Sequence, residues 1–62
     1  MTTIQDAPRQ AVDAAARRLY DAEVALHIAH ASHVDAWIKA ASDRLHEAVV
    51  AHLSAVAEAA RP

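Results

Sequence analysis

The sequence contains no cysteine and no glycine, and its two prolines stand at positions 8 and 62. Without cysteine, no disulfide can stabilise the chain. Inside a helix, glycine costs about 1 kcal/mol and proline about 3 kcal/mol relative to alanine, so residues 9–61 lack the two strongest helix breakers. Eighteen alanines, the best helix formers, are present instead. The sequence therefore predicts an almost wholly helical, all-α chain.

Long apolar runs are missing too. Apolar stretches are interrupted by Glu23, His27, His30 and Lys39 well before the ~20 residues that a bilayer requires, so neither a membrane span nor a membrane partner is expected. The first six residues lack the basic, then apolar, then small-residue pattern of a secretory signal, so the expected location is cytoplasmic. Five arginines against one lysine, with abundant Ala, Val and Asp, are typical of coding by GC-rich DNA and suggest a bacterial source.

Motifs that carry catalysis are also absent from the sequence. There is no cysteine nucleophile, no Gly-rich phosphate loop and no Ser-His-Asp arrangement on a concave scaffold. We therefore expect no catalytic residues and no enzyme activity.

The length of 62 residues allows a single domain. A folded chain of this size buries only about 60% of the surface that its unfolded form exposes, so its core is marginal. With disulfides excluded, the remaining means of stabilisation are a metal ion, a partner subunit or unusually regular helix packing. We favour a partner subunit.

Two series of large and small residues recur at spacings of three and four. The first ladder is Val12, Ala15, Leu19, Ala22, Leu26 and Ala29, and the second ladder is Ile38, Ala41, Leu45, Ala48, His52 and Ala55. This spacing is typical of the seam between two helices, and the alanines allow the backbones to approach closely. Folding the ladders onto each other is expected to pair large with large and small with small, for example Leu19 with Leu45 and Ala22 with Ala41.

The start of the first helix is indicated by two residues. Asp6 can accept hydrogen bonds from free amides as an N-cap, and Pro8 suits a first helical turn because it has no N–H there. These residues predict a short tail over 1–6 and a first helix over 7–31.

A break near the middle of the chain is indicated by a second capping signal. Ser32 and Asp35 have the spacing of a capping box, which predicts a tight turn at 31–33 and a second helix over 32–61. The two ladders are also rotated by roughly a quarter circle about the helix axis, so one straight helix would bury neither well. The alternative is a long, bent or continuous helix, which the lack of glycine at the turn favours.

A two-helix hairpin leaves further apolar residues without cover. Tyr20, Val24 and Ile28 form a second stripe on the first helix, which implies a second neighbour. We therefore expect two hairpins to form an antiparallel four-helix bundle with two-fold symmetry. The expected core and interface residues are Val12, Leu19, Tyr20, Val24, Leu26, Ile28, Trp37, Ile38, Leu45, Val49, His52, Leu53 and Val56. Another protein docking on the Tyr20 stripe is the alternative.

Five histidines stand in the sequence. His52 lies within the second ladder and is expected to be a neutral core or interface residue, hydrogen-bonded to Asp13 or to the partner subunit. Glu23, His27 and His30 lie on one helical flank, and imidazole with carboxylate suits zinc or iron, so a metal site is an alternative there. The preferred reading is a solvated surface with no cofactor.

Nucleic acid is a further alternative partner. The length and the alternation of alanine with large residues resemble the small plasmid-encoded RNA-binding hairpin that dimerises into a four-helix bundle. That resemblance implies an RNA-binding face. Arg9, Arg17 and Arg18, however, point in three directions, and the formal net charge is −2, whereas a phosphate-binding surface needs clustered cations. The sequence therefore favours a small homo-oligomeric interaction module over a nucleic-acid-binding protein.

Overall fold

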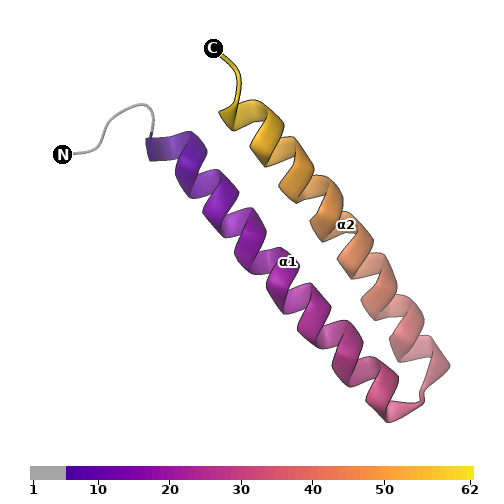
Figure 1. Ribbon diagram of the computed structural model, residues 1–62. Helices are drawn as coiled ribbons and strands as arrows, with labels where there is room; N and C mark the ends of the chain where they lie inside the picture. Colours follow the sequence, from indigo (N-terminus) through magenta and orange to yellow (C-terminus); the bar gives the residue numbers. More distant parts are fainter. Residues whose placement is uncertain (1–5) are drawn as a thin grey trace.

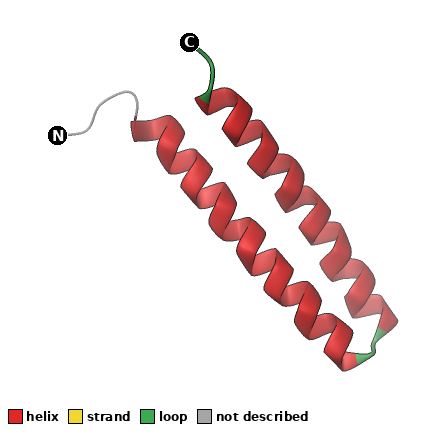
Figure 2. Cartoon of the chain, viewed as in Figure 1, coloured by secondary structure: helices red, strands yellow, loops and turns green. Residues whose placement is uncertain are grey.

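Two helices packed side by side in opposite directions make up the fold of the computed structural model, which describes residues 6–62. Helix α1 spans Asp6–Ser32 and helix α2 spans Asp35–Ala59. A short turn joins them at one end, and the start of α1 and the end of α2 lie at the other (Figures 1 and 2). The all-α hairpin is confirmed, and a continuous helix is not formed. Residues 1–5 of the predicted tail lie outside the described residues, and α1 begins one residue earlier than expected.

The turn closes without glycine because His33 takes a left-handed conformation, with φ of 60°. Glycine usually fills this position after a helix, since it has no Cβ to clash. The His33 amide donates to the His30 carbonyl at 3.2 Å. The Ser32 hydroxyl donates to the Ala29 carbonyl and accepts a hydrogen bond from the Val34 amide at 3.2 Å. Local hydrogen bonds therefore hold the reversal in place.

The predicted capping box is wrong. Ser32 is the last residue of α1, and Val34, with φ of −98° and ψ of 109°, occupies the N-cap of α2 without a side-chain hydrogen bond. The amides of Trp37 and Ile38 both donate to the Val34 carbonyl, each at 3.0 Å. The Ser32 hydroxyl is engaged at the end of α1 and so does not serve the Asp35 amide. Helix α2 consequently starts three residues later than expected.

The two ladders form the seam of the hairpin, since each of their residues is buried or half-buried. Among residues 7–62, the fully buried ones are all alanines, with Ala22 the least exposed at 2%. The large members of both ladders are half-buried. The centre of the hairpin is therefore a narrow contact at which alanine lets the helices come close.

The register across the seam differs from the expected one. Ala22 lies ten residues before the end of α1 and Leu45 ten residues after the start of α2, so the two are level along the hairpin. By the same reasoning Leu19 is level with Ala48. Large residues therefore face alanines, whereas the two ladders were expected to pair large with large. The difference arises because α1 extends to Ser32 and α2 begins only at Asp35.

The hairpin is a single layer of helices, with extents of 47 × 20 × 10 Å. The smallest extent is about the diameter of one helix. Folded domains normally bury their apolar faces between two or more layers. Both broad faces of this layer are uncovered. Neither α1 nor α2 carries a stretch apolar enough to cross a bilayer.

Candidate functional site

A groove lined mainly by alanine runs along one broad face, between the two helices. Its half nearer the chain ends is lined by Arg18, Asp21, Ala22, Arg44, Glu47, Ala48 and Ala51. Its half nearer the turn is lined by Ala25, Ile28, Ala29, Trp37, Ala40, Ala41 and Arg44. We call these residues together the alanine groove. Because methyl groups form most of its floor, a further helix can approach the backbones closely there.

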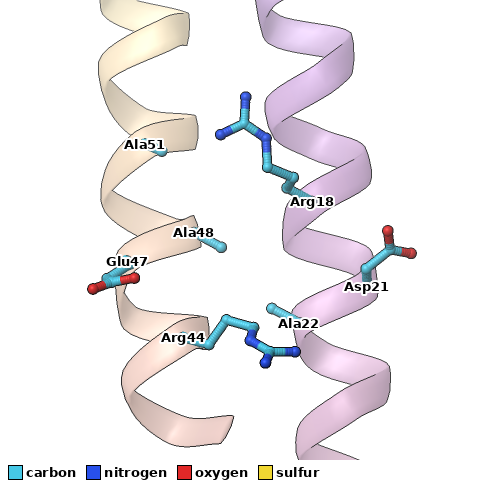
Figure 3. A pocket seen from close by; sticks show the side chains of 7 residues that line it. All are labelled: Arg18, Asp21, Ala22, Arg44, Glu47, Ala48 and Ala51. Atoms are coloured by element: carbon cyan, nitrogen blue, oxygen red, sulfur yellow. The ribbon is translucent and has the colours of Figure 1, made fainter. Parts of the chain in front are cut away.

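Four charged residues surround the middle of the alanine groove. The side chains of Arg18 and Arg44 extend into the space between the helices, one from each helix, whereas those of Asp21 and Glu47 point outward (Figure 3). Within residues 6–62, none of the four forms an ion pair. The groove therefore presents two cations and two carboxylates, none of them in an ion pair with another described residue.

Two large apolar side chains mark the turn end of the groove. Ile28 of α1 and Trp37 of α2 line the same pocket. Ile28 is 63% exposed and Trp37 is 60% exposed. Residues of this type and size are usually covered in folded proteins. Their exposure indicates that this end of the groove lacks a layer that would bury it.

The opposite broad face carries a separate set of apolar residues. By the helical repeat, Tyr20, Val49, Leu53 and Val56 lie on the other side of the two ladders from the alanine groove. All four are exposed. Val24 points away from both faces, along the outer edge of α1, and is exposed as well. The expected stripe of the first helix is thus divided, with Ile28 in the groove and Tyr20 on the opposite face.

The predicted core and interface residues therefore fall into two groups. The half-buried seam residues are Val12, Leu19, Leu26, Ile38, Leu45 and His52. The exposed residues are Tyr20, Val24, Ile28, Trp37, Val49, Leu53 and Val56. The first group holds the hairpin together, and the second stays exposed on the two broad faces and on the outer edge of α1.

The histidine predictions have different outcomes. His52 is half-buried in the seam, but no hydrogen bond joins it to Asp13. Glu23, His27 and His30 are all exposed. In the described part of the chain, no group of three or more His, Asp or Glu side chains is arranged to hold a metal ion. The spacing explains this, because Glu23 and His30 are separated by about 10 Å along the helix axis.

The charged residues of the groove were missed by sequence reasoning, which treated them as solvated faces. A repeated pattern marks them: Arg-Leu-Tyr-Asp-Ala at 18–22 and Arg-Leu-His-Glu-Ala at 44–48. In both copies the leucine and the alanine belong to a ladder. The arginine and the acid, three residues apart, then fall on the same flank of their helix. The repeat therefore gives α1 and α2 equivalent charged faces beside the seam.

Comparisons with models of known protein families, with curated proteins and with solved structures each find no match to this chain.

Proposed function

We propose that this chain is a small homo-oligomeric interaction module without catalytic activity, in which two hairpins pair into an antiparallel four-helix bundle. The functional form is then the assembly, and the functional surface is the face of the hairpin that the second copy covers.

The observation that carries this proposal is the thinness of the core. Among residues 7–62, the fully buried residues are Ala15, Ala22, Ala29 and Ala41, and no large side chain is completely buried. Burying a Val, Leu or Ile side chain contributes about 1.5–3 kcal/mol, and alanine much less. Ordering the chain costs about 1.5 kcal/mol per residue. One layer of two helices therefore gains too little from its own packing.

A second copy of the hairpin supplies the missing layer. It would bury large apolar residues that the single hairpin leaves open, Trp37 and Ile28 among them. It would also complete the burial of ladder residues such as Leu19 and Leu45, which are half-buried in one hairpin. Two-fold pairing of identical faces is the simplest closed assembly for a single type of chain. A four-helix bundle is the expected result.

The lining of the alanine groove supports a binding role over a catalytic one. Neither of its two pockets is lined by a hydroxyl, a thiol or an imidazole, the groups that most often act as nucleophile or general base. Their charged lining consists of two arginines and two carboxylates. Such groups suit recognition of a complementary charged face.

Sedimentation velocity and circular dichroism over a range of protein concentrations test the proposal. We expect a species of about twice the 6.6 kDa chain mass at high concentration. Helix content should fall together with that species on dilution, because folding is coupled to association. A fully helical species of one chain mass at every concentration would contradict the proposal.

A further inference from the structure

The alanine groove carries charges that complement a second copy of itself. Arg18 and Asp21 lie three residues apart on α1, and Arg44 and Glu47 lie three residues apart on α2. Each helix thus contributes one cation and one carboxylate to the same face, and none of the four is ion-paired within the described chain. From this geometry we infer that the two hairpins pair through their alanine grooves, with both turns at the same end and α1 of each copy lying on α2 of the other. The inference rests on the proposed self-association and specifies its interface.

The positions of the four charged residues along the hairpin axis fit this pairing. Arg18 lies fourteen residues from the end of α1 and Glu47 twelve residues from the start of α2. With the turns together, Arg18 of one copy is therefore offset by about 3 Å along the axis from Glu47 of the other. Asp21 and Arg44 are related by the same offset. At each contact between α1 of one copy and α2 of the other, the two carboxylates lie between the two guanidinium groups along the hairpin axis. Each arginine therefore reaches an acid across the interface.

Two hairpins can pair face to face with two-fold symmetry in two ways, with their turns at the same end or at opposite ends. The apolar residues of the groove decide between these two arrangements. With the turns at opposite ends, α1 would lie on α1, and Arg18 would meet Asp21 of the second copy. Charge pairing alone does not separate this arrangement from the first. Ile28 and Trp37, however, both lie at the turn end of the groove. Only the arrangement with both turns together brings Ile28 of one copy against Trp37 of the other and covers these large side chains.

The alanines make close contact feasible along the rest of the face. Ala25, Ala40 and Ala51 occupy the groove between the charged centre and its ends. Their methyl groups allow a helix of the second copy to approach the two backbones closely. Both pockets described above lie on this face of the hairpin, in the alanine groove.

Charge-reversal variants studied by sedimentation equilibrium test the inference. Arg18→Glu should raise the dimer dissociation constant at least about tenfold, because the new carboxylate at position 18 faces Glu47 of the second copy and repels it. Adding Glu47→Arg should restore the constant to within about threefold of the wild type. Combining Arg18→Glu with Asp21→Arg should not restore the dissociation constant. In this double variant the new carboxylate at position 18 faces Glu47 of the second copy, and the new guanidinium at position 21 faces Arg44.

Leu53→Glu, on the opposite face, is the control and should leave the dissociation constant unchanged. Rescue by Asp21→Arg rather than by Glu47→Arg would overturn the arrangement with both turns together. Dissociation by Leu53→Glu, with no effect of Arg18→Glu, would overturn the groove interface while leaving self-association intact. A wild-type chain that stays monomeric at all concentrations would instead contradict the proposed function itself.

Discussion

Ile28 of α1 and Trp37 of α2 line one pocket at the turn end of the alanine groove, although they come from different helices. Both side chains are more than half exposed in the hairpin. Two large apolar residues that line one pocket and remain open to solvent are typical of a surface that is buried on association. The charged residues further along the groove are arranged so that a second copy can provide that cover.

Trp37 is the only tryptophan of the chain and therefore reports on this surface directly. In the paired bundle its indole ring is shielded, so we expect fluorescence emission at shorter wavelength at high protein concentration and a shift to longer wavelength on dilution. Arg18→Glu should give the long-wavelength emission already at high concentration. Emission that does not change with concentration, in a sample that sedimentation shows to be dimeric, would place Trp37 outside the interface.

Leu45→Ala tests the importance of the central layer. Leu45 is half-buried in the seam, level with Ala22, and its truncation leaves a space that alanine on the facing helix cannot fill. We expect a loss of about 2–4 kcal/mol in the free energy of unfolding, measured by urea denaturation at fixed protein concentration. Val50→Ala is the matched control, because Val50 is exposed on the outer edge of α2 and should change stability by less than about 0.5 kcal/mol. An unchanged midpoint for Leu45→Ala would show that this layer is not part of the core.

His33→Gly is expected to stabilise the hairpin. A residue with a Cβ costs about 1–2 kcal/mol in the left-handed conformation that His33 adopts, whereas glycine does not. The greater freedom of glycine in the unfolded chain offsets part of this, which leaves a net gain of about 0.5–1 kcal/mol. The same change at His46, an exposed position inside α2, should instead cost roughly 0.3–0.5 kcal/mol. Thermal unfolding of both variants checks the assignment, which fails if His33→Gly is the more destabilising of the two.

The ion pair between Lys39 and Asp43 should matter little. Lys39 Nζ lies 2.9 Å from Asp43 Oδ2, but the two side chains are 79% and 66% exposed, so solvent screens the interaction. Asp43→Asn also removes a like-charge neighbour of Glu47 one turn further along the helix. We expect a change in the free energy of unfolding within about 0.5 kcal/mol. A larger loss would mean that a further chain buries this pair.

The hairpin follows from the sequence because its signals are local and repeated. The two ladders specify which side of each helix is covered, and the change in their orientation near Ser32 requires a reversal. The register across the seam does not follow in the same way, because it depends on where the turn begins and ends. His33 could not be identified as the left-handed residue, since that role usually falls to glycine. A shift of three residues then changes every pairing, including that of Leu19.

The alanine groove is harder to foresee for a different reason. Arg18 and Arg44 read individually as solvated charges, and alanines read individually as helix formers. They form a groove only because two helices place the same pattern of residues on one face, and this depends on how the chain folds back on itself. The metal alternative gains no support from the hairpin: His27 and His30 share a flank with Glu23, but within residues 6–62 no group of three or more such side chains is arranged to hold a metal ion.

Native mass spectrometry with and without added zinc tests the central claim most directly, because a single measurement reports stoichiometry and bound metal together. The account predicts a dimer of about twice 6.6 kDa whose abundance and mass are the same with and without zinc. A chain that remains monomeric without zinc and pairs only when the metal is retained would contradict it, as would a chain that remains monomeric under both conditions.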